Sequence, residues 1–92
     1  MIELTDDNFE TEIQDGKVVV DCWATWCGKC KMLKPMFEEL SQQKKEYKFC
    51  LLNVDTAPKT TEKLNISNIP AIILFENGKE VMRGSFDMIY KL

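Results

Sequence analysis

The sequence predicts an α/β fold in which a mixed sheet of five strands carries helices on both faces. Strand and helix signals alternate in the order β-α-β-α-β-α-β-β, which is typical of a mainly parallel sheet. Several strand segments are also apolar without interruption, as strands covered on both faces are. With 92 residues, 45% of them hydrophobic, we expect a single domain over residues 1–92.

The first two elements are short. Ile2-Glu3-Leu4 is a strand candidate, and Thr5 carries a hydroxyl suited to a helix N-cap. Asp6-Asp7 would then lie in the first helical turn, where negative charge is favourable. Phe9 and Ile13 lie four residues apart, so we expect them to share the buried face of this helix.

The next two elements carry the clearest periodic signals. Val18-Val19-Val20 is a β-branched run that predicts a buried strand over residues 17–23. Beyond Cys27, apolar residues recur at helical spacing and are expected to face the core. These residues are Met32, Leu33, Met36, Phe37 and Leu40. Pro35 lies within the same pattern and should bend the helix rather than end it.

The second half of the chain completes the sheet. Asn77-Gly78 is a two-residue hairpin signal, so residues 79–86 should return antiparallel and make the sheet mixed. Residues 87–92 leave fewer than two turns for a last helix, at about 1.5 Å per residue. Three further elements are expected: a strand at 47–54, a short polar helix at 56–64 and a buried strand at 71–75.

Composition narrows the classes of function. The net charge of −3 argues against nucleic acid or an anionic membrane as a partner. No apolar run approaches a membrane span, and the chain begins with acidic residues where a signal peptide would carry basic ones. We therefore expect a cytoplasmic protein, whose four cysteines would be catalytic, metal-binding or free. Because histidine is absent, Cys-His catalysis and histidine metal ligation are excluded.

The main chemical signal is Trp26-Cys27-Gly28-Lys29-Cys30 at a strand-to-helix junction. Cys27 would lie at the helix N-terminus, where free N–H groups and the helix dipole lower the pKa of its thiol. Cys30, one turn deeper, would be more shielded and could act as the resolving thiol. Gly28 would allow a substrate backbone to approach closely.

The same spacing also occurs in zinc sites. A four-cysteine zinc site would have to recruit Cys22 and Cys50, both of which are predicted inside strands. We therefore expect no metal site and no bound cofactor. Two unreactive structural cysteines remain a further alternative.

Along nearly its whole length the sequence resembles the thioredoxin family. The matching segments are Leu4-Thr5-Asp6-Asp7-Asn8-Phe9, Val20-Asp21-Cys22-Trp23-Ala24, Trp26-Cys27-Gly28-Lys29-Cys30-Lys31, Leu33-Lys34-Pro35, Leu52-Asn53-Val54-Asp55, Ile69-Pro70-Ala71 and Phe75-Glu76-Asn77-Gly78. The resemblance implies a thioredoxin fold and a protein-disulfide reductase that works through a redox-active Cys27–Cys30 disulfide. It also implies a role in electron transport and cell redox homeostasis, with disulfide-containing proteins as substrates and a thioredoxin reductase as the electron donor.

The resemblance also suggests roles outside the cysteine motif. Asp21 follows three valines, so its carboxylate should be desolvated with a raised pKa, and by resemblance it accepts the proton of Cys30. A purely structural aspartate at the strand end is the alternative. Ile69-Pro70 should be cis and bind the substrate backbone, whereas most X-Pro bonds are trans. Trp26 would offer an apolar platform, and Gly28 and Lys29 complete the predicted substrate-binding set.

The sequence departs from the family pattern at the site and at its C-terminal end. Lys29 replaces a common proline, and Leu51 stands where many members place a lysine near the buried aspartate. Residues 87–92 replace a full C-terminal helix, so Met88, Ile89 and Leu92 would cover only part of one sheet face. A monomer is expected, and a partner subunit could cover the rest of that face.

Two other functions compete with the reductase. One is a glutaredoxin-like protein recharged by glutathione, and the other is a thioredoxin-fold binding module. The combination of Cys27, Cys30, Asp21 and Ile69-Pro70 favours redox chemistry, because a binding role needs none of them. The sequence names neither the physiological substrates nor the particular reductase.

Overall fold

The computed structural model describes residues 1–92 and has the element order expected from the sequence. One mixed sheet contains β1 (Ile2–Leu4), β2 (Lys17–Trp23), β3 (Lys48–Asn53), β4 (Ala71–Glu76) and β5 (Lys79–Gly84). The helices are α1 (Phe9–Glu12), α2 (Gly28–Gln43), α3 (Pro58–Lys63) and α4 (Met88–Lys91).

The strands lie in the order β1-β3-β2-β4-β5, which places β2 at the centre. β3 pairs in parallel with β1 and β2, while β4 pairs antiparallel with β2 and β5. The valine run of β2 is fully buried because both sheet faces are covered. Asp21 lies opposite Leu51 on one side and Ile72 on the other, so apolar residues flank this carboxylate within the sheet.

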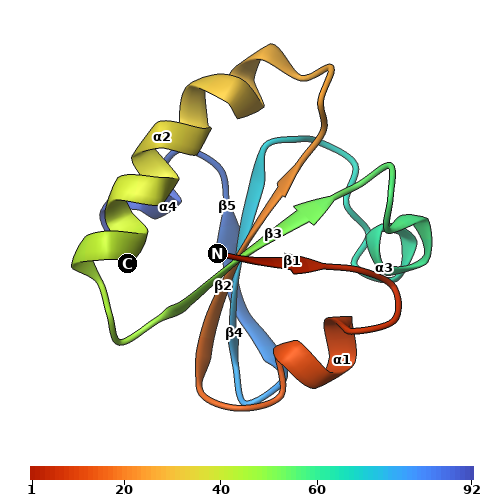
Figure 1. Cartoon of the computed structure of the whole chain (residues 1–92), viewed down its shortest axis with the longest axis horizontal. Helices are drawn as coiled ribbons and strands as arrows, with labels where there is room; N and C mark the ends of the chain where they lie inside the picture. Colours follow the sequence, from red (N-terminus) through yellow and green to blue (C-terminus); the bar gives the residue numbers. More distant parts are fainter.

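Two layers of helix cover the sheet. α2 and α4 lie on one side, and α1 and α3 lie on the other (Figure 1). Val18 and Val20 belong to the core on the α1 side, whereas Val19 packs against α2. Because strand side chains alternate, Asp21 shares the face of Val19 and points toward α2. The strand position alone therefore directs this acid to the helix that carries the cysteines.

The short C-terminal helix packs beside α2, as its apolar residues predict. Met88 is fully buried, and Ile89 and Leu92 pack against the same core cluster. Separately, Asn77 and Gly78 both have positive φ, at 50° and 85°, which confirms the predicted hairpin turn. No helix in the structure combines the length and the apolar character needed to cross a membrane.

The predicted start of the first helix was partly wrong. The Thr5 hydroxyl does accept hydrogen bonds from the N–H groups of Asp7 and Asn8, both at 3.2 Å, but α1 begins only at Phe9. Asp6 instead accepts from the Thr60 N–H at 2.8 Å and so caps α3. Partial desolvation of the Asp6 carboxylate raises its pKa, whereas its hydrogen bonds lower it. The hydrogen bonds have the larger combined effect, so the pKa of Asp6 lies below its usual range.

The placement of Met32 in the core was also wrong, because this residue is 68% exposed. Leu33, Phe37 and Leu40 form the buried stripe of α2, and Met36 is half-buried. One residue advances about 100° around a helix, so Met32 lies well outside a stripe centred on Leu33. Pro35 lies inside α2, as expected.

Candidate active site

The cysteine motif joins β2 to α2. Cys27 is the N-cap of α2 with extended backbone, and its sulfur accepts a hydrogen bond from the Cys30 N–H at 3.1 Å. The two residues form a disulfide with their Cα atoms 5.2 Å apart. Cys27 is 7% exposed and Cys30 is 2% exposed, so Cys30 is the more shielded residue. Free N–H groups and the dipole of a 16-residue helix favour a thiolate at Cys27.

Segments distant in the sequence pack around this disulfide. Ala24 forms a buried cluster with the two cysteines, and Trp23, Val54 and Ile69 pack against it. The Ile69–Pro70 bond is cis, as expected from the sequence. Gly28 lies in the first turn of α2, where a Cβ would meet nothing within 4 Å. Packing therefore does not require glycine at position 28, and open space lies above it.

Trp26 directly precedes Cys27 in the chain and is 68% exposed. Its indole Nε1 donates a hydrogen bond to Asp55 Oδ2 at 2.9 Å, and this contact holds the ring in place. Asp55 follows β3, and the parallel strands β2 and β3 end at the same edge of the sheet. Sequence reasoning missed Asp55, although the parallel pairing could have indicated it.

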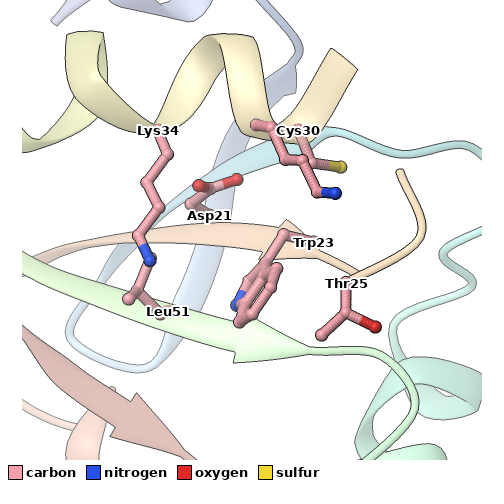
Figure 2. Close-up of a pocket in the computed structure, with 7 residues that line it drawn as sticks. Asp21, Trp23, Thr25, Cys30, Lys34 and Leu51 are labelled. Carbon is pink, nitrogen blue, oxygen red and sulfur yellow. The ribbon is translucent and has the colours of Figure 1, made fainter. Parts of the chain in front are cut away.

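Asp21 faces a pocket beneath the N-terminal half of α2 (Figure 2). The pocket has a volume of about 360 Å³ and also contains Cys30 in its lining. Asp21 is 1% exposed, and its Oδ1 has no hydrogen-bond partner. Burial raises the pKa of Asp21 to about 7, with Lys34 opposing that rise. The remaining lining residues are Trp23, Thr25, Lys31, Lys34 and Leu51.

Lys34 is the cation that faces Asp21 from α2. Figure 2 shows its side chain running down from the helix toward Leu51, with the Asp21 carboxylate between Lys34 and Cys30. The ammonium lies 5.4 Å from the centre of the Trp23 ring, within the range of a cation–π contact. Lys34 follows Cys30 by four residues, so helical periodicity places both on one face. That spacing was the signal that sequence reasoning missed.

A second hollow lies at the cis proline, and its lining includes Lys29 of the cysteine motif. It has a volume of about 630 Å³. Ser85 closes one side, and its hydroxyl donates to the Pro70 carbonyl oxygen at 2.7 Å. We call this hollow the proline groove. Its lining residues are Lys29, Met32, Asn68, Ile69, Pro70, Ser85 and Phe86.

The other two cysteines are free and buried. Burial raises the pKa of Cys50 to about 11 and also moves the pKa of Cys22 upward. Both thiols are therefore poor nucleophiles near neutral pH. No group of three or more histidine, cysteine or acidic side chains is arranged to hold a metal ion.

The structure therefore brings most of the predicted site residues together. Asp21 shares a pocket with Cys30, and Lys29 shares the proline groove with Ile69 and Pro70. Trp26 lies apart from both hollows, toward Asp55. The lining residues that sequence reasoning missed, besides Lys34, are Thr25, Lys31, Asn68, Ser85 and Phe86.

Comparisons with known proteins agree with this geometry. The family model described as Thioredoxin matches residues 1–87. A Thioredoxin of Chlamydia muridarum is 42% identical over 80 residues, which cover 87% of this chain and 78% of the relative. A Thioredoxin of Staphylococcus saprophyticus is 42% identical over 82 residues, which cover 88% of this chain and 79% of the relative. A Thioredoxin of Buchnera aphidicola is 43% identical over 95 aligned positions, which cover 100% of this chain and 87% of the relative.

Proposed function

Because this chain belongs to the thioredoxin family and is a thiol–disulfide oxidoreductase, we propose that Cys27 is its nucleophile, Cys30 its resolving thiol and Asp21 the acceptor of the Cys30 proton. The single observation that carries this assignment is the shared pocket. The buried, unpartnered Asp21 carboxylate and the shielded Cys30 line one cavity, while Cys27 occupies the helix N-terminus.

The first step is attack by the Cys27 thiolate on one sulfur of a substrate disulfide. The Cys27–substrate bond forms, and the substrate disulfide breaks. The departing substrate sulfur leaves as a thiolate and takes a proton from solvent. The helix N-terminus supports this step, because it favours the anion that attacks.

In the second step, Cys30 attacks the Cys27 sulfur of the mixed disulfide. Asp21 takes the Cys30 proton, and the second substrate sulfur leaves as a thiolate. A cavity of about 360 Å³ has room for bridging water between the acid and the thiol. An acid with a pKa of about 7 can accept a proton near neutral pH and release it later. The substrate gains two electrons, and the protein ends with the Cys27–Cys30 disulfide.

We propose that Trp26, Gly28, Lys29, Ile69 and Pro70 bind the substrate beside this disulfide. Trp26 supplies exposed apolar surface, and Gly28 leaves open space over the first turn. Ile69 contacts the cysteine cluster and lines the proline groove, so an extended segment there would pass the sulfurs.

We further propose that a thioredoxin reductase recharges the disulfide and that the protein works as a monomer in the cytoplasm. Met88 of α4 supports the monomer, because it fills part of the sheet face beside α2. Free, buried Cys22 and Cys50 suit a reducing compartment.

The assignment is tested by trapping the mixed disulfide. Cys30→Ser should accumulate a covalent adduct between Cys27 and a substrate such as insulin, detectable by mass spectrometry. Cys27→Ser is the matched control and should form none. An adduct on Cys30 in the Cys27→Ser protein, at the rate seen for Cys27, would overturn the order of attack.

The reductant is tested by turnover of insulin disulfides. We expect turnover with a thioredoxin reductase and NADPH, and little with glutathione and glutathione reductase. The opposite result would favour the glutaredoxin-like alternative, and no turnover with either would favour a binding module.

A further inference from the structure

The proline groove carries a single charged side chain. Its lining is apolar at Met32, Ile69, Pro70 and Phe86, and neutral but polar at Asn68 and Ser85. Lys29 is the exception and stands next to the active-site cysteines in the sequence. Any substrate segment lying in this groove therefore meets one positive charge and no negative one.

The Lys29 charge has no partner within the protein. The structure contains four ion pairs, and none involves Lys29. The first turn of α2 has no acidic residue. The acid near the groove, Asp87, accepts hydrogen bonds from the Ser85 N–H at 2.7 Å and from the Lys91 ammonium at 3.0 Å. Its charge is thus already paired, and Lys29 remains available to a ligand.

We propose that Lys29 is a specificity-determining residue and that the groove accepts extended substrate segments with an aspartate or glutamate close to the reactive cysteine. This inference rests on the proposed function, because it assigns a substrate class to the same site. The occupant is a disulfide-containing segment of another protein whose negative charge complements Lys29.

The surroundings of Lys29 strengthen this complementarity. A segment seated in the groove would displace water from apolar side chains, and a charge pair interacts more strongly where water is excluded. Alternate side chains of an extended segment share one face, so residues two positions from the cysteine lie on the cysteine's own side. An acid at such a position would meet Lys29, whereas a lysine would meet a like charge.

The test uses disulfide-linked homodimers of a short peptide. The residues two positions before and after its cysteine are both Asp, both Asn or both Lys. Pre-reduced protein is mixed with each peptide, and the second-order rate constant is measured after acid quenching, so no reductase is needed. Lys29→Gln removes the groove charge. Lys45→Gln is the matched control, since Lys45 is exposed, unpaired and beyond the far end of α2.

In the native protein, the Asp peptide should react about threefold faster than the Asn peptide, as expected for one partly desolvated charge pair. Lys29→Gln should abolish that preference, and Lys29→Glu should shift it toward the Lys peptide. Lys45→Gln should keep the native ratio, although it changes the net charge equally.

Equal rates for the Asp and Asn peptides in the native protein would overturn the inference. So would an equal loss of preference in Lys29→Gln and Lys45→Gln, because the effect would then be long-range. A different result would contradict the proposed function itself. In that case the reduced protein would not react even with the neutral Asn peptide.

Discussion

The Asp21 carboxylate of β2 and the Lys34 side chain of α2 face one pocket, with Cys30 lining the same space. Leu51, on the neighbouring strand, contributes no charge there. The positive charge that faces Asp21 therefore comes from helix α2 rather than from a neighbouring strand. The proton affinity of this acid then depends on two opposed effects, burial and the Lys34 charge.

The first prediction concerns the stability of the oxidised protein. In the unfolded chain Asp21 titrates near a pKa of ~3.9, whereas in the folded protein its pKa is raised to about 7. Between these values the folded state holds the extra proton, so the free energy of unfolding falls as pH rises through this window. Asp21→Asn should remove that loss and stabilise the protein above pH ~7, by as much as ~4 kcal/mol.

Urea unfolding of the native protein and Asp21→Asn at pH 4 and pH 8.5 measures this difference. The gain should be large at pH 8.5 and small at pH 4. An equal gain at both values would mean that packing, and not ionisation, causes the change.

The second prediction concerns Lys34. Lys34→Met should raise the pKa of Asp21 above its native value, because the opposing cation is gone. The resolving step should then slow at neutral pH, and its pH midpoint should move upward. Lys34→Arg should keep the native midpoint, since it keeps the charge.

Carbon-13 NMR of the Asp21 carboxyl and the pH dependence of mixed-disulfide release measure this pair of effects. A slower step with an unchanged carboxyl midpoint would contradict the prediction and point to packing against Trp23.

The third prediction concerns the redox potential. Lys29 lies in the first turn of α2, exposed and unpaired, close to the sulfur that becomes a thiolate. Its charge and its N–H both favour the reduced form, whereas proline would remove both. Lys29→Pro should therefore lower the potential by about 10–30 mV, toward the ~−270 mV of thioredoxin.

Equilibration with a glutathione redox buffer measures the potential. Lys29→Gln separates the two causes, since it removes only the charge. A potential that stays the same or rises in Lys29→Pro would show that this side chain does not tune the disulfide.

The fourth prediction concerns thiol reactivity. In the native reduced protein, iodoacetamide should label Cys27 first, while Cys22 and Cys50 stay unlabelled. Both free cysteines are buried, and burial raises the pKa of Cys50 to about 11. Peptide mapping after a short alkylation pulse identifies the labelled residue, and denatured protein, in which all four should react, is the control. Labelling of Cys50 as fast as Cys27 would refute this expectation.

Local sequence patterns determined the order and type of the elements. The valine run predicted the central strand, the apolar spacing after Cys27 predicted α2, and Asn77-Gly78 predicted the final hairpin. Each pattern reflects a local preference for helix, strand or turn, and this preference depends only on residues that are close together in the sequence. Cys27 and Cys30 were identifiable for the same reason, since a spacing of three along one helical turn brings the sulfurs together.

Tertiary structure alone decided which partners these residues meet. Met32 and Leu33 belong to one apolar pattern, but only the docking of α2 on the sheet settled that Leu33 is buried and Met32 exposed. Asp6 caps α3 across 54 positions of sequence, and Asp55 holds Trp26 across 29. Such contacts depend on strand order and on the angle at which helices pack, and no local propensity encodes either. The spacing of Lys34 from Cys30 indicates a shared helix face, but only the docking of α2 on the sheet decided that this face meets Asp21.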